Sequence, residues 1–393
     1  MIDLAAVRAD TPAAQRGVFL DSAGSSLAPE PVLAEQFAHL RREAEIGGYQ
    51  AADERAGDFE AGYQVFAELL GCRAEEVAFT ESATRSWVTA FQAVPLGKGD
   101  RVLVGEVEYA SNAIPLLMRA EAVGASVEVV PSDEQGSFSA AALEEMLDER
   151  VKLVSVVHVP TNGGVVAEVR RISEAAHRVG ALVLLDACQA IGQLDLDTDA
   201  LDVDLVTATG RKWLRAPRGT GVLVVRDRAA ERLRPPVADL RGAEWTAPHS
   251  YRLRDDARVH ELWEHGAAAR LGLIRAARYL LELGPAEVEQ AVTARAAHLR
   301  AGLAELPGVT VRDLGGRKSG IVTFTVDGLP AAQVRDLLAA QGITVSVSHR
   351  PSALLDMTNR SLDTVVRASP HYFVTEEQLD ATVAAVAALR RAA

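Results

Sequence analysis

Hydrophobic and polar positions follow two alternating patterns in the first half of the chain. Short, almost uninterrupted apolar runs stand at 77–80, 101–104, 126–130, 153–157 and 181–185, which is typical of strands buried on both faces. Between these runs, apolar residues return at helical spacing near 84–93, 111–123, 140–147 and 169–179. Strands that alternate with helices predict an α/β fold with a mostly parallel sheet, and such sheets bind ligands at the carboxyl ends of their strands.

The regions on either side have other patterns. Residues 19–27 predict a short extended arm ending in a turn, and helical spacing follows at 31–45 and 58–70. After an irregular stretch at 235–256, the pattern predicts helices at 259–283, 286–306, 331–341 and 376–390, and strands at 309–312, 321–326, 343–347 and 364–368. We therefore expect an N-terminal arm at 1–30, a large α/β domain at 31–258, and a long connecting helix with a smaller α+β domain at 259–393.

One lysine stands between two predicted strands in the stretch 203–225. Lys212 lies there in a short polar loop, directly after Arg211. A desolvated amine near another cation has a lowered pKa, and a neutral amine is the form that makes a Schiff base with a carbonyl compound. A surface loop with basic residues fits the same letters equally well, so this stretch alone leaves both interpretations open.

Two other predicted strands end in polar residues. Ser82 and Thr84 follow the first strand and open a helix, where free N–H groups and the helix dipole favour a phosphate, although an ordinary N-cap has the same letters. Asp186 ends a buried strand, and a buried carboxylate needs a cationic or hydrogen-bonding partner. A phosphate site, a buried acid and an amine are together what pyridoxal phosphate requires.

Composition and charge limit the kinds of molecule that this protein is expected to bind. A net charge of −13 disfavours nucleic acid and anionic membranes, since both are bound through an excess of Lys and Arg. Two cysteines provide neither a disulfide framework nor a cysteine-rich metal site, and we expect no metal. The sequence has no signal-peptide pattern and no apolar run long enough to span a bilayer. We expect a cytoplasmic protein whose partner is a small molecule.

Two motifs carry a resemblance to a known family: Asp186-Ala-Cys-Gln-Ala-Ile-Gly192 and the segment from Thr209 to Gly221. With most of the chain, they resemble the fold-type I pyridoxal-phosphate enzymes of aminotransferase class V, which include cysteine desulfurases, isopenicillin-epimerase-like proteins and C–S lyases. The resemblance implies the fold-type I transferase fold with a seven-stranded type of sheet, pyridoxal 5'-phosphate as cofactor, and a homodimer with its active site at the interface.

The resemblance also implies roles for individual residues. Lys212 is the Schiff-base lysine, Asp186 pairs with the pyridinium nitrogen, and Gln189 lies by the phenolic oxygen of the cofactor. Residues at the family's phosphate-binding positions are Ala83, Thr84, Thr209 and Arg211. Thr161 belongs to a loop that reaches the ring, where many relatives have asparagine; Arg367 grips the substrate's α-carboxylate, and Ser25 and Tyr49 are expected at the substrate.

Three departures from the family pattern narrow the reaction. Ala110 stands where desulfurases carry a histidine stacked on the ring, so that group is missing or comes from elsewhere, for example from Tyr109. No cysteine lies between Ser346 and Arg367, where desulfurases carry a sulfur-accepting cysteine, and Cys72 and Cys188 occur in unrelated places. Ser346 itself stands where a second arginine often occurs. Ordinary cysteine desulfuration is therefore disfavoured.

The leading hypothesis is a C–S lyase acting on an S-substituted cysteine or its sulfoxide, through an external aldimine, Cα deprotonation by Lys212 and β-elimination. Residues 43–52 support it, because they resemble lyases of ergothioneine biosynthesis and enzymes that process S-glycosyl cysteine in lincosamide pathways. One of the latter decarboxylates and deaminates its substrate oxidatively, and this reaction stays open here, as do transamination and epimerisation. A non-catalytic binding protein is disfavoured because Lys212, Asp186 and Arg367 are all retained.

Overall fold

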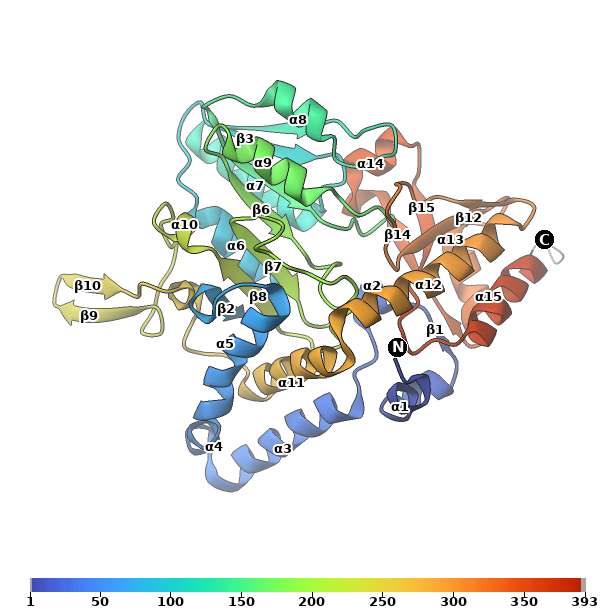
Figure 1. The fold of residues 1–393 in the computed structure, drawn as a ribbon, viewed down its shortest axis with the longest axis horizontal. Coiled ribbons are helices and arrows are strands. Elements are labelled where there is room, and N and C mark those ends of the chain that lie inside the picture. Colours follow the sequence, from blue (N-terminus) through green and yellow to red (C-terminus); the bar gives the residue numbers. More distant parts are fainter. Residues whose placement is uncertain (1, 390–393) are drawn as a thin grey trace.

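A computed structural model describes the chain from residue 2 to residue 389, and its centre is a seven-stranded sheet (Figure 1). In order across the sheet, its strands are β2 (Val77–Thr80), β8 (Gly221–Val225), β7 (Leu205–Thr209), β6 (Leu182–Asp186), β5 (Val151–Val157), β3 (Arg101–Gly105) and β4 (Ser126–Val130). Strand β8 is antiparallel to both of its neighbours, and the pairs from β7 to β4 are all parallel. The predicted α/β fold with a mostly parallel sheet is confirmed.

The central strands are apolar along their whole length because both faces of the sheet are covered. Every residue of β6, β7 and β8 is buried, as expected for strands of a parallel sheet between two layers of helices. The helices that connect successive strands from β2 to β6 are α6 (Ala83–Ala93), α7 (Ala110–Val123), α8 (Ala140–Met146) and α9 (Val169–His177), and α10 (Asp227–Ala230) follows β8.

One edge of the sheet collects the polar strand ends. Strand β6 ends at Asp186 and β7 ends at Thr209, and the register pairs Asp186 with Thr207. Strand β2 has the same direction as β7, because both are antiparallel to β8, so Thr80 and the start of α6 reach this edge as well. Topology therefore brings together the strand ends that the sequence analysis singled out.

Helices before and after the sheet pack against each other. They are α3 (Glu30–Ile46), α4 (Gly48–Glu54), α5 (Ala56–Leu70), α11 (Ala267–Leu283) and α12 (Pro285–Ala304), and α11 packs on α3 and α5. The prediction of a helix from residue 259 is wrong for its first part, since Ala257–His260 form a 3-10 helix and α11 begins only at Ala267. The carboxylate of Glu261 accepts the N–H of Phe79 at 2.9 Å and the hydroxyl of Tyr63 at 2.8 Å, and these contacts hold the segment away from a helical path.

A second sheet of four antiparallel strands lies on the C-terminal side. Its order is β11 (Val309–Val311), β12 (Val322–Val326), β15 (Thr364–Ala368) and β14 (Ser346–His349), with α13 (Ala331–Ala339), α14 (Leu354–Asn359) and α15 (Glu376–Leu389) around it. The N-terminal arm packs on this side: β1 (Val18–Phe19) pairs with β13 (Ile343–Thr344), and α1 (Leu4–Ala9) and α2 (Ser22–Ser25) flank β1. The division into domains at residue 258 stays a prediction, and residue 390, given as the end of the last helix, lies outside the described residues.

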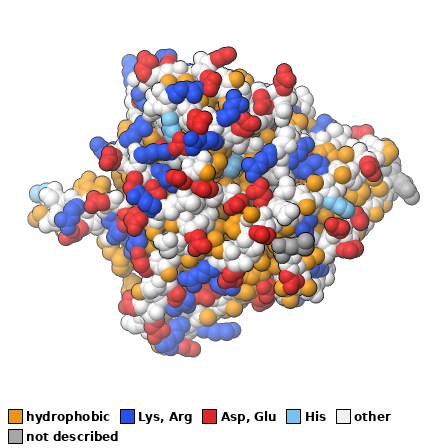
Figure 2. Space-filling view, in the orientation of Figure 1, with side chains coloured by type: hydrophobic (Ala, Val, Ile, Leu, Met, Phe, Trp, Pro, Cys, Tyr) orange, Lys and Arg blue, Asp and Glu red, His pale blue; other side chains and the backbone are white. Residues whose placement is uncertain are grey.

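A two-stranded hairpin projects from the body of the molecule (Figures 1 and 2). It consists of β9 (Ala243–Ala247) and β10 (Ser250–Leu253), and Trp245 and Tyr251 are 80% and 71% exposed. The sequence analysis left this stretch irregular, because neither face of the hairpin is buried and no alternation marks it. Charges of both signs are scattered over the surface in Figure 2. No described helix is both long and apolar enough to cross a membrane.

Candidate active site

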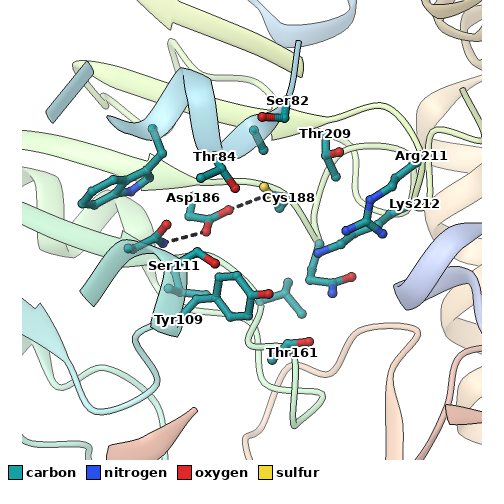
Figure 3. Close-up of a pocket in the computed structure, with 16 residues that line it drawn as sticks. Ser82, Thr84, Tyr109, Ser111, Thr161, Asp186, Cys188, Thr209, Arg211 and Lys212 are labelled. Atoms are coloured by element: carbon teal, nitrogen blue, oxygen red, sulfur yellow. Dashed lines mark hydrogen bonds between the residues drawn. The ribbon is translucent and has the colours of Figure 1, made fainter. Parts of the chain in front are cut away.

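A cavity opens where the polar ends of β2, β6 and β7 meet (Figure 3). It is lined by Ser82, Ala83, Thr84, Trp87, Tyr109, Ser111, Asn112, Val157, Val159, Thr161, Asp186, Cys188, Gln189, Thr209, Arg211 and Lys212. All residues that the sequence analysis assigned to the cofactor are among them. The roles of these residues stay predictions, but the fold does bring them together.

The N-terminus of α6 forms one wall of the cavity. Ser82 caps the helix, since its Oγ accepts the backbone N–H of Arg85 at 3.1 Å. The N–H groups of Ala83 and Thr84, in the first turn, have no partner within the helix, and the helix dipole adds positive potential at this end. Gly221 on β8 lies directly behind, where a Cβ would come within 2.4 Å of the Ser82 carbonyl carbon. The result is a backbone cradle suited to a phosphate.

Asp186 is held by hydrogen bonds to each of its carboxylate oxygens. Its Oδ2 accepts Asn112 Nδ2 at 2.8 Å, and its Oδ1 accepts the backbone N–H of Cys188 at 2.9 Å. The side chain is 6% exposed, at the end of a fully buried strand. Both bonds are to neutral donors, so the carboxylate keeps its charge available for a cation in the cavity.

Lys212 extends into the cavity toward Asp186 and Cys188 (Figure 3). Burial lowers the pKa of its amine below the ordinary value, against the opposing attraction of neighbours that include Asp186. Among residues 2–389, no hydrogen bond to its Nζ is formed. The adjacent Arg211 donates from Nη1 to the carbonyl of Gly24, which ties the loop to the N-terminal arm.

Gln189 lines the cavity, and hydrogen bonds hold both ends of its amide. Its Oε1 accepts the indole N–H of Trp213 at 2.9 Å, and its Nε2 donates to the carbonyl of Ala23 at 3.1 Å. Because Ala23 takes one N–H of the amide, its NH₂ group has a second N–H that can donate to a ligand. This donor suits a contact with an oxygen atom of a ligand.

Arg367 lies next to the cavity but does not line it. Its Nη1 donates to Thr161 Oγ1 at 2.8 Å, its Nε to Ser346 Oγ at 3.1 Å, and its Nη2 to Asp21 Oδ1 at 3.1 Å. Strand β15, the 161 loop and the N-terminal arm therefore meet at this guanidinium. A carboxylate that binds it bidentately has to replace at least one of these acceptors.

Some predicted residues are not at the cavity. Ser25 ends the short helix α2, and Tyr49 on α4 is 74% exposed; neither lines the cavity, and their roles stay predictions. Tyr109 lines the cavity whereas Ala110, the first residue of α7, does not. Cys188 lies outside the segment between Ser346 and Arg367, but its position two residues after Asp186 puts it in the cavity wall.

Sequence reasoning missed several polar residues of the site. Asn112 and Glu108 were not singled out, although their i, i+4 spacing before and inside α7 is a signal that two polar side chains share one helix face. Asp21, the partner of Arg367, carried no local signal at all. Its contact depends on the bridge between Asp21 in the N-terminal arm and Ser369, directly after β15.

These residues fit pyridoxal phosphate. The chemistry of the donor set is complete: a helix N-terminus cradled on Gly221 for the phosphate, Asp186 for a cationic ring nitrogen, and Lys212 for the aldehyde carbon. Gln189 and Arg211 stand around the same space.

The Aminotransferase class-V family matches residues 18–382. A protein from Mycobacterium leprae named probable cysteine desulfurase 2 is 31% identical over 410 residues, covering 98% of this chain and 96% of that protein. A probable cysteine desulfurase from Pyrococcus abyssi is 26% identical over 385 residues, and the match covers 95% of this chain and 94% of that protein.

Solved structures share the fold. A cysteine desulfurase from Escherichia coli superposes with a TM-score of 0.92 at 24% identity, covering 100% of this chain and 99% of that one. A cystine C–S lyase, solved in complex with its product cysteine persulfide, has a TM-score of 0.85 at 22% identity. The match covers 96% of this chain and 99% of that one. The chain belongs to the class V aminotransferase family and is a pyridoxal phosphate-dependent enzyme.

Proposed function

We propose that this protein is a C–S lyase that cleaves an S-substituted cysteine, or its sulfoxide, by β-elimination. The observation that carries the proposal is the segment between β14 and β15. It contains no cysteine, although in the desulfurases that the chain resembles this segment supplies the sulfur acceptor. Sulfur has to leave on the product when the protein offers no thiol to receive it.

The same segment is anchored and does not hang freely. Asp356 on α14 accepts Asn162 Nδ2 at 2.5 Å, and Asn359 Nδ2 donates to Glu106 Oε1 at 2.8 Å. The backbone N–H of Asp356 also donates to the carbonyl of Glu106 at 3.1 Å. These contacts tie α14 to two loops of the large sheet. A segment held in this way suits a fixed wall of the substrate site better than a mobile carrier of sulfur.

The two cysteines of the chain are poor sulfur acceptors. Burial raises the pKa of Cys72 to about 12, and it raises the pKa of Cys188 well above its ordinary value. The thiolate is the nucleophilic form of cysteine, so a raised pKa suppresses its reactivity. Cys188 lies in the cavity wall, but its thiol stays protonated at neutral pH.

The chain's own residues supply the remaining steps. Bound pyridoxal phosphate provides the electron sink that makes the Cα proton acidic. Lys212 takes this proton, since its lowered pKa makes the neutral amine accessible. Arg367 orients the α-carboxylate, and Tyr109 offers an aromatic face at the cavity wall. In sum, an S-substituted cysteine and water give a thiol, pyruvate and ammonia; a sulfoxide gives a sulfenic acid in place of the thiol.

We further propose a homodimer in the cytoplasm, with the active site at the interface. Tyr49 supports the dimer: it is expected at the substrate, yet it is 74% exposed and outside the cavity of its own chain. A partner subunit is the simplest way to bring it to a site. Light scattering at micromolar concentration tests this proposal, and a single monomeric species would contradict it.

The reaction is tested by incubating the purified protein with S-alkyl cysteines and measuring pyruvate and thiol. Equal amounts of both are expected, together with loss of turnover in Lys212→Ala. Racemised amino acid, or a keto acid that keeps its sulfur, would contradict β-elimination. A Lys212→Ala protein that turns over freely would contradict the role of the lysine.

A further inference from the structure

A second buried carboxylate stands behind Asp186, joined to it by a single amide. Asn112 Nδ2 donates to Asp186 Oδ2 at 2.8 Å and to Glu108 Oε1 at 2.9 Å, so one NH₂ group bridges the two acids. Glu108 also accepts Ser155 Oγ–H at 2.7 Å and the backbone N–H of Tyr109 at 2.8 Å. The bridge runs from Asn112 on α7, which lines the cavity, to Asp186 at the end of β6.

Glu108 is buried without a cationic partner. The residue is 4% exposed, and among residues 2–389 no ion pair to it is formed. Its hydrogen-bond donors are all neutral, and the charge of Asp186, which has the same sign, also acts on it. Burial, reinforced by Asp186, raises the pKa of Glu108 to about 7. Burying a carboxylate in this way is costly unless something compensates for it.

A positive charge that compensates for the buried carboxylates can lie on the cavity side of Asp186. Asp186 accepts one nitrogen donor on each oxygen, from Asn112 and from the backbone of Cys188, and a carboxylate has further lone pairs for a ligand. A protonated pyridine nitrogen at this place faces one carboxylate directly and a second one through the Asn112 amide. Two negative groups in line favour the proton on that nitrogen more than one does.

We propose that Asn112 and Glu108 are positioning residues that fix Asp186 and, through the charge of Glu108, strengthen the hold of the site on the proton at the ring nitrogen of pyridoxal phosphate. The proposal rests on the proposed pairing of Asp186 with that nitrogen. It does not depend on the substrate, because the effect exists in the loaded enzyme before any substrate binds.

The test reads the ring nitrogen itself. The enzyme is loaded with pyridoxal phosphate carrying ¹⁵N in the ring, and the ¹⁵N resonance, which differs strongly between protonated and unprotonated pyridine, is followed with pH. In Glu108→Gln, which keeps the shape but removes the charge, the midpoint of deprotonation is expected to fall by about one pH unit, a roughly tenfold weaker hold on the proton. Activity does not enter this measurement.

Two further variants complete the experiment. Glu106→Gln is the matched control, because it makes the same substitution two residues away. The Glu106 carboxylate accepts hydrogen bonds from Ser132 and Asn359 and does not contact the Asp186 bridge. In this variant the ring nitrogen is expected to lose its proton at the same pH as in the parent. Ser155→Ala removes a donor that favours ionised Glu108, so a smaller fall is expected, and it serves if Glu108→Gln does not fold.

The outcomes separate the inference from the function. A parental ¹⁵N resonance at every pH in folded, loaded Glu108→Gln or Ser155→Ala would overturn the proposal, and so would an equal fall in Glu106→Gln. An unprotonated ring nitrogen in the parent enzyme would overturn it together with the pairing of Asp186. Failure of the lyase reaction would show instead in the pyruvate measurement, with the ¹⁵N result unaffected.

Discussion

Gly221 offers a direct test of the phosphate cradle. A Cβ at this position would lie 2.4 Å from the carbonyl carbon of Ser82, 2.6 Å from its oxygen and 2.7 Å from the nitrogen of Ala83. These are backbone atoms at the start of α6, where no flexible side chain can move aside. Ordinary contacts begin at 3.4 Å, so in Gly221→Ala the Ser82–Ala83 peptide has to move by roughly 0.7 to 1.0 Å.

The magnitude follows from what the peptide does. Overpacking of this kind costs about 1–3 kcal/mol of folding free energy. The same movement displaces the N–H groups that face the phosphate, and losing one hydrogen bond to a charged group costs about 1.5–3 kcal/mol. We therefore expect Gly221→Ala to bind pyridoxal phosphate about tenfold to a hundredfold more weakly than the parent.

Equilibrium titration of the cofactor-free protein with pyridoxal phosphate, followed by absorbance, measures this affinity. Gly57→Ala on α5 is the matched control, because the added Cβ meets no atom within 4 Å, and its affinity should equal that of the parent. Circular dichroism verifies that both variants are folded. A folded Gly221→Ala protein with parental affinity would refute the placement of the phosphate at α6.

Two other predictions concern charge. Asp21→Asn removes the carboxylate charge that competes with the substrate for Arg367. We expect steady-state kinetics to show a KM for the amino-acid substrate about threefold to tenfold lower, with little change in kcat. An unchanged or raised KM would contradict this competition. Glu108 has a folded-state pKa of about 7 against an ordinary 4.5, so its stabilising contribution is present below pH 4.5 and is lost as pH rises toward 7. In cofactor-free protein, Glu108→Gln should therefore gain stability relative to the parent between pH 5 and pH 8, by at most about 3 kcal/mol in urea denaturation; a pH-independent difference would contradict this account.

The strands and the central residues of the site could be predicted because the information is local. Apolar runs buried on both faces identify β6, β7 and β8 wherever they occur, and a polar residue at the end of such a run is visible in the letters. Asp186 ends one of these runs, and Lys212 follows the end of another by three residues. Parallel pairing then places them on one edge without further information.

What escaped prediction depends on contacts between distant segments. The hairpin β9–β10 buries neither face, so no alternation marks it. The helix predicted from residue 259 is broken because Glu261 bonds Tyr63 and Phe79, far away in sequence. The contacts of Arg367 with Asp21 and Thr161 likewise join three separate parts of the chain.

The fate of the sulfur and of the carbon skeleton tests the central claim most directly. An S-substituted cysteine labelled with ¹³C is turned over, its products are identified by NMR, and the intact protein is weighed by mass spectrometry. The account predicts labelled pyruvate, one free thiol per pyruvate, and a protein of unchanged mass. Labelled alanine, with sulfur added to a cysteine of the protein, would contradict it.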